Sequence, residues 1–306
     1  MTTTLTQERG LQELTAKVKR IQAFSNSFAD AGAMLEPACW AKELADIDPL
    51  QYGAIFADVG LDLKEHDIGG KLLKDASPIP HPTNREGYNG EHHLAYWLMG
   101  YRLFLQCTEL LTAHGISQGR YFDFGGSTGR VFRHFYHQSS AWDVWSCDFK
   151  LTSFRWNSVH FPTAIKCFQN MYFPFLPIPD GHFDFISAFS VFTHIDETEE
   201  MWLLELRRIL KDGGAIILTV HNDATWHTMG PELRKSVERY RPDLATLSSL
   251  PEGRHVVQWR DDDPYRCNVF HSNAYLRRNW GRFFEVIQVI DRFAGAQAAV
   301  LLRKHC

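Results

Sequence analysis

A glycine-rich turn, YFDFGGSTGR at residues 121–130, is the segment of this sequence whose residue types could do chemistry. A strand that passes into a helix through such a turn leaves backbone N–H groups without partners at the start of the helix. Gly125, Gly126 and Gly129 would let a ligand approach the main chain closely. Asp123, just before the turn, would attract an ammonium or sulfonium group and would repel a pyrophosphate.

A second acidic residue, Asp148, ends the next strand-like segment, DVWSCDF. In open α/β sheets, an acid at this place accepts hydrogen bonds from ribose hydroxyls. Asp123 and Asp148 together therefore predict a site for a nucleoside that carries positive charge at its other end. The competing interpretation is that both carboxylates only cap the helices that follow them.

Strands and helices must alternate to position these residues, and the sequence from Arg120 onward has this pattern. The segments are RYFDF, GRVFRHFYHQ, DVWSCDF, a helix near 154–159, AIKCFQN, FDFISAFS, ETEEMWLLELRRILK and AIILTVHND. Strands separated by helices of this length predict right-handed crossovers and a parallel sheet covered on both faces. The last two strands, EVIQVID and AQAAVLLRK, are separated only by RFAGA, so we expect them to pair antiparallel. The predicted fold class is α/β.

Several of these segments, in this order, resemble class I S-adenosylmethionine (SAM) methyltransferases. DFGGSTG resembles their first motif, an acidic residue followed by alternating glycines, although Ser127 stands where the middle glycine is usual. FPFLPIPDGHFDFISAFSVFTHI, LRRILKDGGAIILTVH and FHSNAYLRRNWGRFFEVIQVI with GAQAAVLLRK resemble later parts of the same domain. The resemblance covers residues 86–306 and implies a doubly wound, Rossmann-like, mostly parallel seven-stranded sheet that ends in an antiparallel hairpin.

The resemblance also implies that SAM is the cofactor. The turn would contact its methionine part, Asp148 its ribose and Phe149 its adenine, while Asn170 or the neighbouring Gln169 would lie at the adenine edge. Turn asparagines and core tyrosines are common, so Asn170, Tyr96 and Tyr101 also have purely structural interpretations. The implied cofactor-binding residues are Tyr96, Tyr101, Asp123, Gly125, Gly126, Ser127, Gly129, Asp148, Phe149, Asn170, Ala188 and Phe189.

Two histidines are candidates for a catalytic base, because imidazole titrates near neutral pH. His194 follows the fourth strand in VFTHID, and His221 ends the fifth in LTVHND. Each could instead cap a helix or bond a loop carbonyl. His221, Asp223, His227 and Asp196 match no strong metal-ligand spacing, so no metal is expected.

An insert at about 223–273 is expected to form a lid over the acceptor. Its candidate contacts, which could equally pack the insert onto the sheet, are Trp226, Tyr240, Trp259, Tyr265 and His271. The predicted substrate-binding residues are His194, Trp226 and His271. SVFTHI, FHS and GAQ resemble methyltransferases associated with sugar modification, which implies O-methylation of a glycan or of a small hydroxylated acceptor.

Two alternatives compete with this interpretation. GGSTG also fits the G-x-S-x-G elbow of α/β-hydrolases, with Ser127 as nucleophile, but Asp123 would repel the oxyanion and no HGGG-type segment precedes the elbow. The chain could also be a SAM-binding partner protein without catalytic activity, since the glycine turn is altered.

The N-terminal 1–85 are expected to form a helical extension or lid. Apolar residues recur at helical spacing over 11–28, and a second helix is predicted over 40–47. Proline, glycine and asparagine in 75–90 predict no regular element there, and an amphipathic helix is expected over 92–114.

Charge and hydropathy restrict the partners. The 306 residues carry a net charge of −4 and no basic run, which argues against nucleic acid. No apolar stretch reaches membrane-spanning length and no secretory signal pattern is present, so we expect a soluble, cytoplasmic protein. The six cysteines lack metal-ligand spacing and are expected to be reduced.

Overall fold

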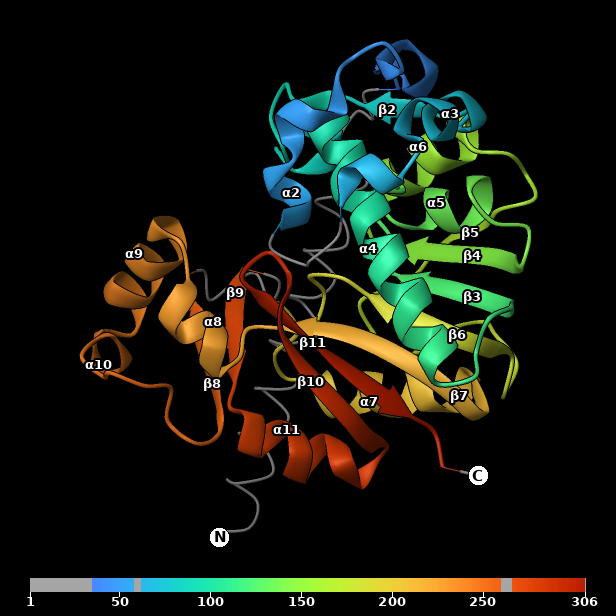
Figure 1. The fold of residues 1–306 in the computed structure, drawn as a ribbon. Helices are drawn as coiled ribbons and strands as arrows, with labels where there is room; N and C mark the ends of the chain where they lie inside the picture. Colours follow the sequence, from blue (N-terminus) through green and yellow to red (C-terminus); the bar gives the residue numbers. More distant parts are fainter. Residues whose placement is uncertain (1–34, 58–61, 260–265, 306) are drawn as a thin grey trace, which may run out of the picture.

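The computed structural model describes residues 35–57, 62–259 and 266–305, and its centre is a seven-stranded sheet (Figure 1). The strand order is β10-β11-β7-β6-β3-β4-β5, and neighbours pair parallel except where β11 is involved. The strands are β3 (Gly119–Phe124), β4 (Trp142–Asp148), β5 (Lys166–Gln169), β6 (Phe183–Ala188), β7 (Leu210–Val220), β10 (Glu285–Ala294) and β11 (Gln297–Arg303). The predicted doubly wound, mostly parallel sheet is confirmed.

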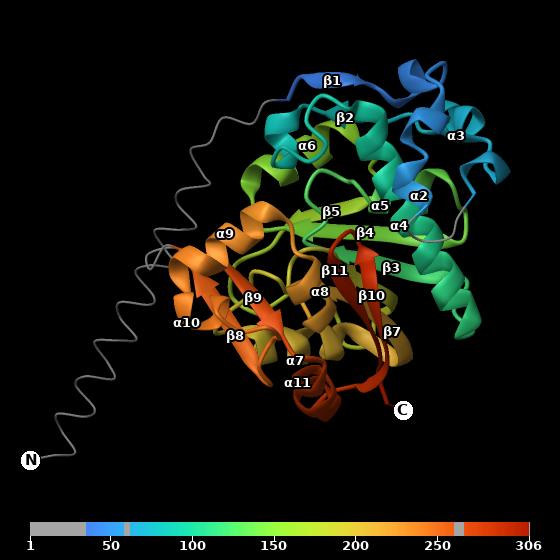
Figure 2. The ribbon, with the colours of Figure 1, turned by 60° about the vertical axis from the view of Figure 1, so that its left-hand side comes forward.

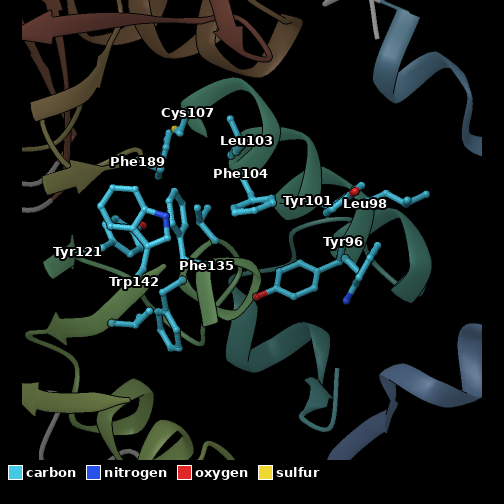
Figure 3. Packing of buried hydrophobic residues seen from close by; sticks show 14 of the residues in the cluster. Tyr96, Leu98, Tyr101, Leu103, Phe104, Cys107, Tyr121, Phe135, Trp142 and Phe189 are labelled. Atoms are coloured by element: carbon cyan, nitrogen blue, oxygen red, sulfur yellow. The ribbon is translucent and has the colours of Figure 1, made fainter. Parts of the chain in front are cut away.

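Helices cover both faces of the sheet, because each central strand is apolar on both sides. On β3, Tyr121 faces one core and its neighbour Phe122 faces the other. Figure 3 shows the first core, where Tyr121 and Phe135 pack with rings 4.0 Å apart. The helices that contribute to the first core are α4 (His93–Ala113), α5 (Phe132–His137) and α6 (Leu151–His160), and those of the second are α7 (Glu199–Ile209) and α11 (Asn273–Asn279).

The final hairpin is antiparallel, as its short connection predicts. β11 lies between β7 and β10, with Val300 opposite Leu218 on one side and Val289 on the other. Its residues 298–302 are all buried, which matches the apolar run AAVLL. β11 therefore completes the sheet as an internal strand.

The N-terminal part differs from the expected helical extension. The helix expected over 40–47 is present only as the short 3-10 helix η1 (Ala41–Leu44). The preceding residues Pro37–Trp40 form β1, and the segment predicted to lack regular structure contains its antiparallel partner β2 (Pro78–Pro80). The expected helix over 11–28 lies outside the described residues. The remaining elements are η2 (Pro49–Tyr52), α2 (Ala54–Ala57), η3 (Leu63–Glu65), α3 (Ile68–Lys74) and η4 (Pro82–Arg85).

A buried ion pair attaches this N-terminal part to the sheet domain. The Arg133 side chain on α5 donates to Asp75 from Nε at 2.7 Å and to the carbonyls of Pro78 and Ser77 at 3.1 and 2.8 Å. The Trp97 indole on α4 also donates to Asp75, at 2.8 Å. The side chains of Asp75 and Arg133 are both 0% exposed. This cluster therefore positions β2 and the segment after it, part of which lines the cavity described below.

The insert forms a small module of its own beside the carboxyl ends of the parallel strands (Figure 1; Figure 2). Its buried core includes Trp226, Val237, Val257 and Phe270. The helices and strands of the module are α8 (Asp223–Thr228), α9 (Pro231–Tyr240), α10 (Pro242–Ala245), β8 (Arg254–Gln258) and β9 (Cys267–His271). In the ranges that the structure describes, no helix is long and apolar enough to cross a membrane.

Candidate active site

A cavity opens where β3 and β4 end, at the place that the topology of an open α/β sheet favours for ligands. Its volume is about 860 Å³ when the open mouth is included. The turn after β3, the segment 148–150 after β4 and the loop 189–191 after β6 form its floor. The segment 85–88 and Tyr96 form the wall on the N-terminal side.

Asp148 lies at the centre of this floor. Its carboxylate accepts hydrogen bonds from the main-chain N–H groups of Ser127, at 3.0 Å, and Lys150, at 2.8 Å. Burial raises the pKa of Asp148 to about 6, although these two N–H groups oppose the shift. The carboxylate therefore braces the turn and is ionised at neutral pH.

Ser127 explains why glycine is usual at its position. Its φ is 48°, in the left-handed region that disfavours side chains. The conformation is held from both ends, since Asp148 accepts from its N–H and Asn157 donates to its carbonyl at 2.8 Å. The altered turn thus keeps the geometry that the motif requires.

Asp123 lies beneath the turn and is only 2% exposed. Its Oδ1 accepts from the Ser187 hydroxyl at 2.8 Å. Burial raises the pKa of Asp123 to about 7, and the Ser187 hydrogen bond and the charge of Arg130 limit the rise. Asp123 is thus a buried carboxyl at the cavity floor, and it is mostly ionised only above about pH 7.

A polar group without a partner lies at the β5 end of the cavity. Asn170 is 9% exposed, and its Nδ2 donates to the Met171 carbonyl at 3.0 Å. Its Oδ1 is buried and has no hydrogen-bond partner in the described part of the chain. Phe149 lines the same cavity, whereas Gln169 bonds the Phe149 carbonyl at 3.0 Å. An aromatic ring and an unsatisfied acceptor together suit a nucleobase that carries an amino group.

Three of the sequence-predicted cofactor residues do not line the cavity. Ala188 is fully buried at the end of β6, and Tyr101 stacks on Trp97 inside the core. Gly129 has a φ of 87°, and a side chain there would clash with Phe161. Gly129 thus allows close packing of the turn against Phe161.

Of the two candidate bases, the structure brings His194 to the cavity. Its Nδ1 lies 2.6 Å from the Cys267 carbonyl, and because a carbonyl only accepts, Nδ1 carries the proton and Nε2 the lone pair of the neutral ring. Burial lowers the pKa of His194, so the ring is neutral near pH 7. Cys267 is the first residue of β9, and the insert therefore orients this histidine.

His221 is buried and does not line the cavity. Its ring packs against Phe270 with centroids 5.2 Å apart, and its main chain bridges to the same residue. Burial, together with the nearby His194 and His271, lowers its pKa to about 3. His221 thus joins β7 to the insert, and its position does not favour proton transfer.

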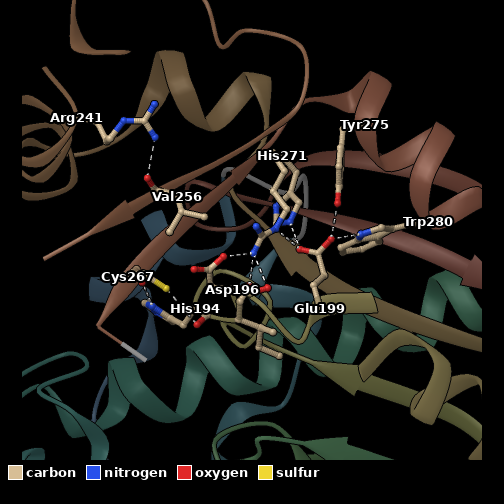
Figure 4. A network of polar contacts seen from close by, with 11 residues as sticks. His194, Asp196, Glu199, Arg241, Val256, Cys267, His271, Tyr275 and Trp280 are labelled. Atoms are coloured by element: carbon tan, nitrogen blue, oxygen red, sulfur yellow. Dashed lines mark hydrogen bonds and ion pairs between the residues drawn. The ribbon is translucent and has the colours of Figure 1, made fainter. Parts of the chain in front are cut away.

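Two of the predicted acceptor contacts in the insert, Trp226 and His271, are buried instead. Trp226 is 1% exposed in the insert core, and His271 is 0% exposed with its Nε2 2.6 Å from the Glu199 carboxylate (Figure 4). Tyr240 is 37% exposed on α9, Trp259 bonds the Arg266 carbonyl, and Tyr265 lies outside the described residues. His271 and Trp226 therefore hold the insert together rather than contact an acceptor.

Glu199 is the centre of the network that docks the insert onto α7 (Figure 4). Arg254 on β8 donates to it at 2.9 Å, Tyr275 at 3.1 Å and Trp280 at 2.9 Å. Burial alone would raise the pKa of Glu199, but His271 and Arg254 hold it at about 2. This network keeps β9, and with it the carbonyl that orients His194, in place.

Sequence reasoning missed part of the cavity lining. Arg85, Glu86 and Tyr88 come from the segment that we expected to lack structure, and Lys150, which forms an ion pair with Glu86, follows Asp148. Arg130 directly follows the glycine turn, and this adjacency is the one signal that could have identified it.

A family profile described as a methyltransferase domain matches residues 96–289, more than half of the chain. The chain belongs to this methyltransferase family. It is an enzyme that uses SAM as cofactor, as its motifs predict, and the hydrolase alternative built on Ser127 is set aside.

Solved structures that are similar to the chain have low sequence identity to it. A possible histamine N-methyltransferase from Thermotoga maritima is 18% identical, covering 73% of this chain and 98% of its own, with a TM-score of 0.45. A SAM-dependent methyltransferase from Methanosarcina mazei is 16% identical, covering 64% and 97%, with a TM-score of 0.44. The glycopeptide N-methyltransferase MtfA, complexed with sinefungin, is 15% identical, covering 66% and 86%, with a TM-score of 0.44. A search of the curated proteins found no match.

Proposed function

We propose that this methyltransferase methylates a hydroxyl group of a small acceptor or glycan in the cavity at the ends of β3 and β4, with His194 as the general base. The observation that carries the proposal is the orientation of His194, whose Nδ1 donates to the Cys267 carbonyl while the ring lines the cavity. A neutral hydroxyl is a weak nucleophile and gains from a base, whereas a neutral amine does not need one.

The cavity residues fit SAM. Asp148 suits the ribose hydroxyls, and Asn170, with its unpartnered Oδ1, suits the amino group of adenine beside Phe149. Bound SAM supplies a methyl group on a sulfonium centre. The ionised form of Asp123 beneath the turn favours the positively charged half of the ligand, while Gly125, Gly126 and the Ser127 main chain allow it to approach.

The chain's own contribution to the reaction is position and proton transfer. The segment 85–88 and the loop 189–191 restrict water and hold the acceptor in line with the methyl group. Nε2 of His194 would take the hydroxyl proton as the oxygen–carbon bond forms and the carbon–sulfur bond breaks, with the neutral thioether as the leaving group. The insert keeps the imidazole aligned through β9.

The atom that receives the methyl group can be tested directly. Carbon-13 methyl-labelled SAM is incubated with the enzyme and with matched panels of phenols, sugars and primary amines, and the product methyl resonances are read by NMR. We expect oxygen-bound methyl signals. Transfer to amines alone would overturn the proposed acceptor class.

Replacement of His194 with glutamine should separate chemistry from binding. We expect kcat on a hydroxyl acceptor to fall by about 10²–10⁴-fold, because the base is lost, while the Kd of S-adenosylhomocysteine (SAH) changes by less than about threefold. The matched control is His255→Gln, since His255 bonds the Pro251 carbonyl at 3.0 Å and does not line the cavity. Full turnover of the His194→Gln variant would mean that the reaction needs no general base and that the enzyme acts by positioning the reactants alone.

The affinity for SAH should also depend on pH through Asp148. Ribose hydroxyls donate to the ionised carboxylate, whose pKa in the free protein is about 6. We therefore expect Kd to be nearly constant above about pH 7.5 and to rise by up to about tenfold per unit below pH 6. Calorimetry between about pH 5 and 8 measures this, and Asp148→Asn should lose the Asp148 part of the slope. An affinity that is unchanged down to pH 5 would contradict the prediction.

A further inference from the structure

Two arginines, Arg130 and Arg85, line the cavity together with the turn after β3. Arg130 is half-buried directly after the turn, and its guanidinium stacks on the Tyr88 ring at 4.6 Å from the centroid. Within the described ranges it has no hydrogen bond or ion pair. Arg85 is 1% exposed and lies over the Tyr96 ring at 4.7 Å.

Arg85 is also incompletely paired. Its Nη2 bonds the Gly90 carbonyl and lies 3.0 Å from Nδ1 of His93. Its Nε and Nη1 are buried and have no partner in the part of the chain that the structure describes. Buried donors of a charged group are costly to leave unpaired, so the positive charge of this side chain is not balanced by the hydrogen bonds that it makes.

The acids of the cavity do not neutralise these two arginines. Glu86 is paired with Lys150, at the side of the cavity next to Asp148. Asp123 is bonded to Ser187 beneath the turn and forms no ion pair with Arg130, although it is near enough to feel its charge. The cavity therefore carries unpaired positive charge beside a buried carboxyl, an arrangement that suits a zwitterion.

The position of Arg130 relative to Asp148 indicates which part of a ligand it meets. Asp148 bonds the N–H of Ser127, Tyr96 approaches Thr128 at 3.4 Å between the hydroxyls, and Arg130 follows two residues later. A ligand with its ribose at Asp148 that extends along the turn therefore reaches Arg130 with its opposite end. On the SAM placement given under Proposed function, this is the amino-acid end.

We propose that Arg130, with the buried Arg85 behind Tyr96, binds the carboxylate of the amino-acid part of SAM and so selects the intact cofactor over shortened thioadenosines. A guanidinium presents two parallel N–H groups that match a carboxylate. Stacking on Tyr88 holds the plane of Arg130 in place. The segment 85–88 thereby becomes part of the cofactor site.

The test uses two probes on the full chain, SAH and 5′-methylthioadenosine, which lacks the amino-acid part. For Arg130→Met, calorimetry should give a Kd for SAH that is about 10- to 100-fold higher, because a hydrogen-bonded charge pair is lost, and a Kd for methylthioadenosine within about twofold of wild type. Arg130→Lys should fall between the two. The matched control is Arg239→Met, an arginine stacked on Tyr240 at 5.3 Å outside the cavity.

Each other outcome overturns the inference in a distinguishable way. Equal weakening of both probes would mean that Arg130 only shapes the cavity. Unchanged SAH binding would mean that Arg130 is available to an anionic group on the acceptor instead. If wild type bound neither probe, the proposed placement of SAM itself would be wrong. Thermal unfolding of each variant checks that weaker binding is not caused by loss of the fold.

Discussion

Replacing Asp148 with alanine should raise the Kd of SAH by about 100-fold or more. Two ribose hydroxyls donate to this carboxylate in the proposed complex, and each hydrogen bond to a charged group contributes about 1.5–3 kcal/mol. The carboxylate is only 6% exposed, so water does not compensate for its loss. Isothermal calorimetry on the purified chain measures the effect.

Two further variants make this prediction specific. Asp148→Asn keeps the shape and part of the bonding to the Ser127 and Lys150 N–H groups, so it should weaken SAH less than alanine does. Asp143→Ala removes an acid from the other end of the same strand, where Asp143 pairs with Lys166, and should leave Kd unchanged. An Asp148→Ala variant that folds and binds SAH like wild type would remove the ribose assignment.

Replacing Arg133 with methionine should lower the free energy of unfolding by about 3–5 kcal/mol. The change leaves the carboxylate of Asp75 buried without its main counter-charge, and breaking one side of a buried pair costs about this much. It also leaves the Pro78 and Ser77 carbonyls without their donors. Urea unfolding monitored by circular dichroism measures the loss.

An exposed pair provides the control. Arg282 and Glu200 form an ion pair at 3.1 Å with side chains 59% and 50% exposed, so Arg282→Met should cost less than about 1 kcal/mol. The pKa of Asp75 is held below its usual value by Arg133 and His137 in spite of burial. Its contribution to stability is therefore full above the unfolded pKa near 3.8 and is lost as the pH falls through the folded pKa. A loss below about 1 kcal/mol for Arg133→Met would contradict this account of the N-terminal attachment.

The sheet domain could be predicted because its signals are local. The glycine turn, the apolar strands and the short gap before AQAAVLLRK each follow from a few neighbouring residues. Their order specifies the topology through general rules of handedness and connection. Asp148 was found for the same reason, since the end of a strand is visible in the sequence.

The N-terminal part could not be predicted because its signals are distant. β1 pairs with β2 about forty residues further along, and three of the prolines that argue against strands, Pro37, Pro78 and Pro80, lie in this pair. Arg85 and Tyr88 are likewise distant in sequence from the cavity residues at the ends of β3, β4 and β6. They line the cavity because the ion pair of Asp75 with Arg133 holds the segment around β2 against α5. Tertiary contacts, not local propensity, decide these positions.

Burial explains why two residues of the insert that the sequence predicts to contact the acceptor do not line the cavity. Trp226 and His271 have residue types that suit an acceptor site. The Trp226 side chain, however, packs in the insert core, and the His271 ring is bonded to Glu199. His194 and His221 lie in segments with similar sequences, and their tertiary contacts distinguish them. The Cys267 carbonyl of β9 orients His194 at the cavity, whereas His221 packs against Phe270. The spacing of residues in the sequence does not predict such tertiary contacts.

A crystal structure of the chain with SAH tests the central claim most directly. The account predicts adenosine density at the ends of β3 and β4, with the ribose hydroxyls within hydrogen-bond distance of Asp148 and the adenine beside Phe149 and Asn170. SAH bound elsewhere on the molecule, or a ribose that makes no contact with Asp148, would contradict it.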